Sequence, residues 1–213
     1  MIVTEAVTTY LEAIRPAPDP VLAEMEAHAA RDGIPIVHAP AGQLLTVLAV
    51  ATGASRVVEI GTAIGVSTLY LARGLAEGGR IVSFEVDPER RDAAAGDLER
   101  AGVADRIDLR LKDAREGLAE LAPPVDLAFI DGVKEQYPDY LDAVIPLLRP
   151  GAVVAVDNVL MSGAVAEGVA TGPWGEGHVV GMRAFNERLM SRPELAATIT
   201  PVGDGVALAV RRA

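Results

Sequence analysis

Four polar residues lie at or just after the ends of two apolar segments. Residues of these types could hold a metal ion and move a proton. The segment "VDLAFID" ends at Asp131, Lys134 lies three residues further on, and "AVVAVDN" ends at Asp157 and Asn158. If both segments are neighbouring parallel strands, their carboxyl ends bring two carboxylates and one amide oxygen together. Such hard ligands suit magnesium, and also calcium or manganese, better than zinc or copper. The alternative is that Asp157 and Asn158 only cap a turn.

Lys134 has two interpretations. A solvated surface position is the commoner one for a lysine. Beside a divalent cation, however, the ammonium form of a lysine is disfavoured by like charge and partial burial. A lysine that loses its proton near neutral pH can act as a general base. The same cation promotes loss of the proton from a phenolic hydroxyl. Both effects favour the deprotonation of an oxygen nucleophile.

A glycine turn and a later acid indicate a nucleoside site. In "VVEIGTAIGVST", Gly61 and Gly65 lie between a strand and a helix, where glycines let backbone N–H groups approach a ligand. Glu85 ends the next strand and can accept hydrogen bonds from both hydroxyls of a ribose. A dinucleotide site would have a third glycine near Ser67, so its absence favours an adenosine-type cofactor, with Ala114 beside the adenine. A turn selected for geometry alone is the alternative.

The elements that must position these residues alternate along the chain. The expected strands are "RVVEIG", "RIVSFEV", "IDLRL", "VDLAFID" and "AVVAVDN", and the expected helices cover residues 66–77, 88–101, 114–121 and 136–148. Strands separated by helices of this length predict an α/β domain with a mainly parallel sheet and helices on both faces. The tail, "TITPVGDGVALAVRR", predicts an antiparallel hairpin at one edge.

We expect one domain over residues 1–213, with a helical segment at 1–40 and a cofactor-binding core at 41–213. Tyr10, Leu11 and Ile14 recur at helical spacing, "RPAPDP" then interrupts the chain, and a second helix ends near Gly33.

The composition excludes several classes of function. The 213 residues carry a formal net charge of −11, which argues against nucleic-acid binding. There is no cysteine, so disulfides, thiolate nucleophiles and cysteine-ligated zinc are excluded. The three histidines, His28, His38 and His178, have no ligand-like spacing. No apolar run is long enough for a membrane span, and the first residues lack a basic secretory leader. A soluble cytoplasmic protein is expected.

In combination, the motifs resemble the cation-dependent class I O-methyltransferases, the group of catechol and caffeoyl-CoA O-methyltransferases. The resemblance runs from about Gly42 to Arg211 and rests on "GQLLTVLA", "EIGTAIGVSTLYLA", "FEVDP", "FIDGVKEQYPDYL", "LLRPGAVVAVDNVL" and "RAFNERL". It implies a Rossmann-like, doubly wound sheet of seven strands with the last one reversed, extra N-terminal helices, and a homodimer.

The resemblance also implies roles for individual residues. The S-adenosylmethionine site would comprise Glu59, Gly61, Gly65, Ser67, Glu85 and Ala114, with Asp131 near the amino-acid end of the cofactor. Asp131, Asp157 and Asn158 would bind the divalent cation, most simply Mg²⁺, and Lys134 would be the catalytic lysine. The expected reaction is methylation of one hydroxyl of a small aromatic vicinal diol of catechol, caffeoyl or flavonoid type.

Departures from the family lie around the acceptor site. Gly132 and Val133 replace a more usual Ala-Asp, Met161-Ser162 stand where many relatives have Trp-Arg, and residues 1–40 match only loosely. Trp174 is expected either to line the acceptor pocket or to anchor a loop. Tyr137 and Tyr140 are expected to pack rather than react.

Three other functions compete with this expectation. They are a metal-independent methyltransferase, a non-catalytic cofactor-binding module of the same fold, and a nicotinamide oxidoreductase.

Overall fold

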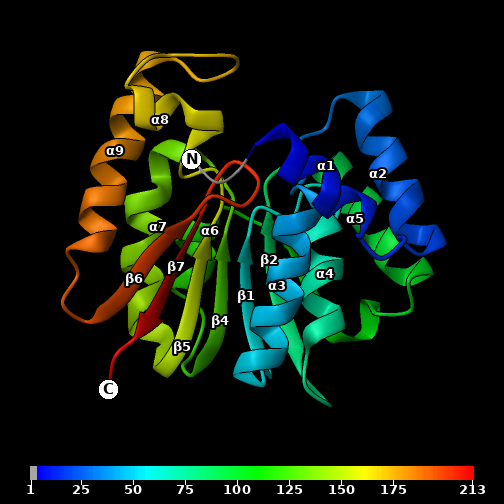
Figure 1. Cartoon of the computed structure of the whole chain (residues 1–213). Helices are drawn as coiled ribbons and strands as arrows, with labels where there is room; N and C mark the ends of the chain where they lie inside the picture. Colours follow the sequence, from blue (N-terminus) through cyan, green and yellow to red (C-terminus); the bar gives the residue numbers. More distant parts are fainter. Residues whose placement is uncertain (1–3) are drawn as a thin grey trace.

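A β-sheet runs through the middle of the molecule, with helices on both of its faces (Figure 1). The computed structural model describes residues 4–213; the first three residues of the expected N-terminal segment lie outside this range. The strands are β1 (Arg56–Ile60), β2 (Arg80–Glu85), β3 (Ile107–Leu111), β4 (Val125–Ile130), β5 (Leu148–Val156), β6 (Leu195–Thr200) and β7 (Val206–Arg211). The helices are α1 (Glu5–Ala13), α2 (Pro20–Asp32), α3 (Ala39–Thr52), α4 (Val66–Gly74), α5 (Pro88–Arg100), α6 (Ala114–Leu118), α7 (Tyr137–Val144), α8 (Ala164–Glu167) and α9 (Glu176–Met190).

The sheet has seven strands in the order β3-β2-β1-β4-β5-β7-β6. The pairs from β3 to β5 are parallel, whereas β7 is antiparallel to both β5 and β6. This confirms the predicted doubly wound sheet with a reversed last strand and a C-terminal hairpin. The helix expected at 136–148 is shorter than predicted, because a 3₁₀ turn follows α7 and β5 already begins at Leu148.

Each face of the sheet has its own hydrophobic core. One core joins α2, α3, α4 and α5 to the sheet, and the other joins α6, α7 and α9. Because both faces are covered, a central strand is mostly apolar. β4, with the sequence VDLAFI, is buried at every position, and its one charged residue, Asp126, accepts hydrogen bonds from Nε of Arg149 at 2.5 Å and from the N–H of Ser55 at 2.8 Å. None of the helices among residues 4–213 is long and apolar enough to cross a membrane.

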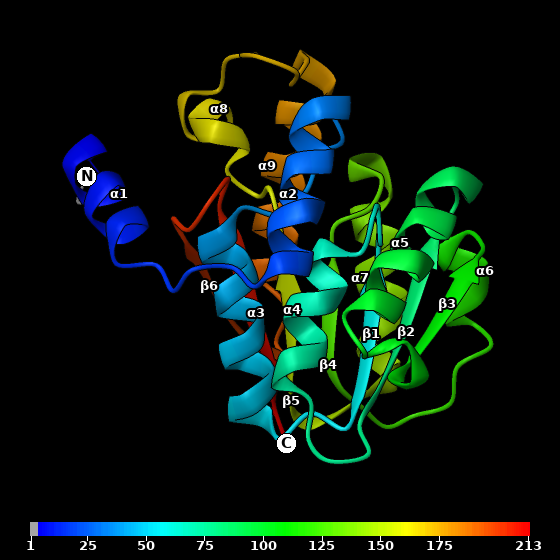
Figure 2. The ribbon, with the colours of Figure 1, turned by 90° about the vertical axis from the view of Figure 1, so that its right-hand side faces the viewer.

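The N-terminal helices agree with the expected helix boundaries. α2 begins after Asp19, whose side chain accepts a hydrogen bond from the N–H of Leu22 at 3.0 Å, and it ends at Gly33 with φ +65°. α2 packs on α4 and α5, whereas α1 stands away from the rest of the molecule (Figure 2). The apolar side chains of Tyr10, Leu11 and Ile14 are exposed.

The register of the sheet sets up the site. Ile60 of β1 is paired with Phe84 of β2 and with Ile130 of β4, and Ile130 is paired with Val156 of β5. The next residue on each strand therefore falls in one row at the carboxyl end of the sheet. That row comprises Glu85, Gly61, Asp131 and Asp157. Four of the residues selected from the sequence are thus aligned by strand pairing alone.

Candidate active site

A cavity of about 660 Å³ lies at the carboxyl ends of these strands. Most of the predicted site residues line it, namely Gly61, Ser67, Glu85, Ala114, Asp131, Lys134, Asp157 and Asn158. Glu59 and Gly65 do not line the cavity. Its volume is that of a site for a cofactor-sized small molecule. The structure therefore brings both predicted half-sites, the glycine turn and the acidic cluster, into one cavity.

Gly61 is required by the close approach of two loops. Its φ is +93°, and a Cβ at this position would lie 2.4 Å from the backbone oxygen of Asp131. The first residue of the turn thus packs directly against the loop that carries Asp131. Gly65 is different: a Cβ there would meet Ala94 of α5 at 3.3 Å, so this glycine permits helix packing.

Glu85 is held in place by the backbone. Its Oε2 accepts a hydrogen bond from the N–H of Ala63 at 2.7 Å, and its Oε1 accepts from the N–H groups of Val86 and Asp87 at 2.8 and 2.9 Å. A carboxylate has about four acceptor positions, so it can still accept a hydrogen bond from a ligand. This geometry suits the predicted contact to ribose hydroxyls.

Glu59 is completely buried beneath the glycine turn. Its Oε2 accepts hydrogen bonds from the hydroxyls of Thr68 and Ser83, at 2.5 and 2.6 Å. Its Oε1 has no hydrogen-bond partner among the described residues. Burial raises the pKa of Glu59 to about 7. The position of Glu59, between the strand and the turn, suits support of the cofactor loop from below.

Asp131, Lys134 and Tyr137 form a connected group. Nζ of Lys134 lies 2.7 Å from Oδ1 of Asp131 and 2.7 Å from the hydroxyl of Tyr137. The Tyr137 hydroxyl in turn donates to the backbone oxygen of Asp157 at 3.2 Å. Lys134 is not a freely solvated surface residue, because its side chain is only 15% exposed. The group links the ends of β4 and β5.

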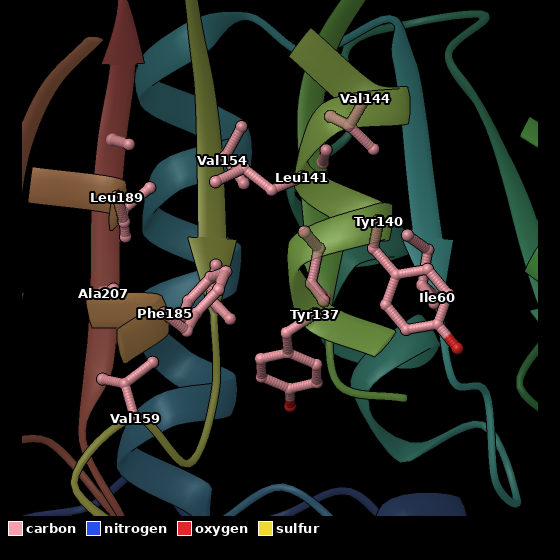
Figure 3. Packing of buried hydrophobic residues seen from close by; sticks show 14 of the residues in the cluster. Ile60, Tyr137, Tyr140, Leu141, Val144, Val154, Val159, Phe185, Leu189 and Ala207 are labelled. Atoms are coloured by element: carbon pink, nitrogen blue, oxygen red, sulfur yellow. The ribbon is translucent and has the colours of Figure 1, made fainter. Parts of the chain in front are cut away.

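Tyr137 is a functional candidate that the sequence did not identify. Its ring packs as expected, fully buried and edge-on to Phe185, with the ring centroids 5.5 Å apart. Figure 3 shows the hydroxyl pointing out of this cluster. A 3₁₀ turn over Lys134–Gln136 brings the hydroxyl to the lysine. The spacing Lys134-x-x-Tyr137 was the available signal, since residues three apart share one face of such a turn.

Asp157 is a buried carboxylate whose negative charge is stabilised by few hydrogen bonds. It is 2% exposed, and the hydrogen bond identified for its side chain comes from the N–H of Asn158 at 2.7 Å. Burial, and next the charge of Asp131, raise the pKa of Asp157 to about 7. Asn158 lines the cavity with a left-handed backbone, φ +60°. Two neighbouring acids beside a single lysine fit a divalent cation, which would neutralise their charge.

Other metal-site geometries find no support. Among residues 4–213, no group of three or more His, Cys, Asp or Glu side chains is placed to hold a metal. The predicted set of two carboxylates and one amide is a different combination of ligands. His28 pairs with Asp32 and His178 with Glu135, at 3.1 and 3.0 Å.

The remaining walls of the cavity come from distant parts of the chain. Pro35 to His38 contribute from the segment before α3, Pro173 and Trp174 from the loop before α9, and Asp204 from the β6–β7 turn. Trp174 also packs against the hydrophobic core, so it both lines the cavity and anchors its loop. Another hollow, of about 430 Å³, lies at the amino ends of the strands. The arginines that line it, Arg56 and Arg80, donate to backbone carbonyls.

Comparison with known proteins decides the family. A sequence model of O-methyltransferases matches residues 17–212. The chain belongs to the O-methyltransferase family. A catechol O-methyltransferase of Mycobacterium tuberculosis is 39% identical to this O-methyltransferase over 215 residues, which cover 97% of this chain and 95% of the relative. A catechol O-methyltransferase of Niastella koreensis is 33% identical over 217 residues, which cover 97% and 96% of the two chains.

Solved structures agree with this assignment. An O-methyltransferase from Bacillus cereus, crystallised in complex with SAH, superposes with a TM-score of 0.85 and 33% identity, covering 97% of both chains. The fold of this O-methyltransferase and the family expected from its motifs are therefore confirmed.

Proposed function

We propose that this O-methyltransferase uses S-adenosylmethionine and a divalent cation to methylate one hydroxyl of a small aromatic vicinal diol of catechol, caffeoyl or flavonoid type. The observation that carries the proposal is the meeting of the glycine turn and the Asp131–Lys134–Asp157 group in one cavity. A methyl donor and an acceptor hydroxyl must lie side by side for in-line transfer, and one cavity with both half-sites permits that arrangement.

The cofactor half of the proposal uses the glycine turn and Glu85. Gly61, Ser67 and Ala114 would line the S-adenosylmethionine site, and Glu85 would accept from its ribose hydroxyls. Glu59 and Gly65 would act indirectly, by supporting the turn and by packing α4 on α5. Bound S-adenosylmethionine supplies a methyl group activated by its sulfonium charge.

The acceptor half of the proposal uses the acidic cluster. Asp131, Asp157 and Asn158 would hold the cation, which supplies positive charge that makes an acceptor hydroxyl more acidic and orients it. Mg²⁺ suits these oxygen ligands, and Ca²⁺ or Mn²⁺ are further candidates. The buried, poorly compensated carboxylate of Asp157 supports this assignment.

Lys134 would be the general base. As a neutral amine, its Nζ would take the proton of the acceptor hydroxyl, and the acceptor oxygen would bond to the methyl carbon as the carbon–sulfur bond of the methyl donor breaks. Asp131 and Tyr137 hold Nζ from two sides, so the lysine is oriented before the acceptor binds. Little further covalent chemistry is needed, because positioning can contribute about 7–11 kcal/mol to such a reaction.

The proposal extends to the domain, the assembly and the location. Residues 1–40 would shape the acceptor site of a single domain, which the cavity-lining residues Pro35 to His38 support. We also propose a homodimer; the exposed apolar side chains of α1, and those of Val47 and Val50 on α3, support a contact between two copies. We also propose a cytoplasmic location, which the composition of the chain, with no cysteine, supports.

Methyl transfer from S-adenosylmethionine to catechols, caffeoyl esters and hydroxylated flavonoids tests the function. Activity on a vicinal diol that disappears in excess EDTA and returns with Mg²⁺ is the expected result. Full activity after exhaustive EDTA treatment would favour the metal-independent methyltransferase instead. Calorimetric titration with S-adenosylmethionine and with NAD tests the nicotinamide oxidoreductase, which should bind NAD instead. Binding of S-adenosylmethionine without methyl transfer to any acceptor would indicate a non-catalytic module.

A further inference from the structure

The turn that carries Asn158 has an unusual backbone. Asn158, Met161 and Ser162 have φ values of +60°, +47° and +54°. Asparagine adopts this left-handed region with little cost, but methionine and serine rarely do. Such a conformation persists only where surrounding contacts enforce it.

The β6–β7 turn supplies those contacts. The backbone oxygen of Asp204 accepts hydrogen bonds from the N–H groups of Leu160 and Met161, at 2.9 and 3.1 Å, and the oxygen of Gly205 accepts from Val159 at 3.0 Å. Gly205 leaves no space between the two turns, since a Cβ there would lie 2.4 Å from Leu160.

One side-chain hydrogen bond closes this contact. Oγ of Ser162 donates to Oδ1 of Asp204 at 2.9 Å, across 42 positions of sequence. Asp204 also lines the cavity. The charge of Asp204 acts on Asp131 and Asp157, but the side chain that hydrogen-bonds to it is that of Ser162. Its contact with Ser162 gives it a different role.

We propose that Ser162 and Asp204 are positioning residues that hold the left-handed backbone of Asn158, Met161 and Ser162 and so fix the side chain of Asn158 for cation binding. The inference rests on the proposed function, in which Asn158 is a cation ligand. It assigns a role to Ser162 and to the Gly-Asp-Gly turn of the C-terminal hairpin. Residues that orient a metal ligand commonly affect metal affinity by about 10- to 100-fold.

Binding of Mn²⁺ alone, followed by the electron paramagnetic resonance signal of the free ion, tests the role in the metal site. Ser162→Ala and Asp204→Ala should each bind Mn²⁺ about tenfold more weakly than the unchanged protein. Asp204→Asn should bind almost normally, because its amide oxygen still accepts from Ser162. The double variant should be no weaker than either single variant, since both changes remove the same bond.

Matched controls and a contrary result are available. Ser191→Ala removes an exposed hydroxyl that donates to the backbone oxygen of Arg188, and Asp92→Ala removes an exposed carboxylate; both should bind Mn²⁺ normally. If Ser162→Ala binds Mn²⁺ normally while Asp204→Asn is as weak as Asp204→Ala, the carboxylate acts through its charge and the inference is wrong.

A second measurement needs no metal. Amide hydrogen exchange at Leu160 and Met161 should be about tenfold faster in Ser162→Ala and Asp204→Ala, with exchange in β1 unchanged. Unchanged exchange at both amides would overturn the inference. Faster exchange in a protein that never binds Mn²⁺ would instead contradict the proposed function and, with it, the role in cation binding.

Discussion

The hydroxyl of Tyr137 lies 2.7 Å from Nζ of Lys134 and 3.2 Å from the backbone oxygen of Asp157, so one buried side chain connects the proposed base to the proposed metal site. Burial, and next the charges of Asp131 and Asp157, raise the pKa of Tyr137 well above its ordinary value. The phenol therefore stays neutral; it accepts from the lysine and donates to the carbonyl.

Tyr137→Phe should lower kcat about three- to tenfold with little change in the affinity for S-adenosylmethionine, because Nζ loses one of its two orienting partners. The free energy of unfolding should fall by about 2 kcal/mol, because the variant loses both hydrogen bonds of this hydroxyl and each such bond usually contributes about 1 kcal/mol. Steady-state kinetics and urea unfolding measure both effects. Tyr140→Phe is the matched comparison: Tyr140 also lines the cavity, but its hydroxyl bonds Gln136 at 2.5 Å rather than Lys134. Equal losses of kcat in the two variants would contradict the orienting role.

Lys134→Ala should reduce kcat at least about 100-fold, the lower range for loss of a general base. Affinity for S-adenosylmethionine, measured by calorimetry, should change by less than about twofold, because Lys134 belongs to the proposed acceptor half of the cavity. Lys112→Ala provides the matched comparison: Lys112 also lines the cavity but pairs with Glu120, and kcat should be retained. Unchanged turnover in Lys134→Ala on the true acceptor would remove Lys134 as the base.

The site residues that could be predicted from the sequence are those whose position depends on strand pairing. Asp131 and Asp157 each end an apolar run, and parallel strands align such ends in one row. The apolar runs and the residues that end them were therefore enough to predict where these two side chains lie.

The contacts that could not be predicted depend on tertiary packing. Asp204 meets Ser162 across 42 positions of sequence, and the hydroxyl of Tyr137 reaches the backbone oxygen of Asp157 across 20. The motifs select Glu59 as a site candidate, but its burial beneath the turn is visible only in the structure. The pattern of residue types along the chain does not show which residues far apart in the sequence come into contact.

Gly61→Ala should weaken S-adenosylmethionine binding more than about tenfold and lower the free energy of unfolding by about 3 kcal/mol. Part of that loss is the left-handed backbone, which costs other residues roughly 1–2 kcal/mol. The rest is the clash of the new Cβ with the backbone of Asp131. Gly53→Ala measures the cost of the left-handed backbone by itself, because Gly53 has φ +58° and a Cβ added there would meet no heavy atom within 4 Å. Equal destabilisation of the two variants, measured by urea unfolding, would show that the close approach is unimportant.

Glu59→Gln should change the pH dependence of stability. The pKa of Glu59 is about 7 in the folded protein and 4.5 ordinarily, so the folded state keeps its proton over a range in which the unfolded state loses it. Stability of the unchanged protein should therefore fall as pH rises from about 4.5 to about 7, and this contribution should then level off.

Glutamine is an uncharged analogue of the protonated acid, so Glu59→Gln should lack this loss. The difference in unfolding free energy between the variant and the unchanged protein should grow by up to roughly 3 kcal/mol between about pH 4.5 and about pH 8. Urea unfolding at several pH values measures it, with the exposed Glu99→Gln as a control that should follow the unchanged protein. A difference that stays constant with pH would mean that folding does not raise the pKa of Glu59, and the buried carboxylate under the glycine turn would then need a cationic partner that the described residues do not supply.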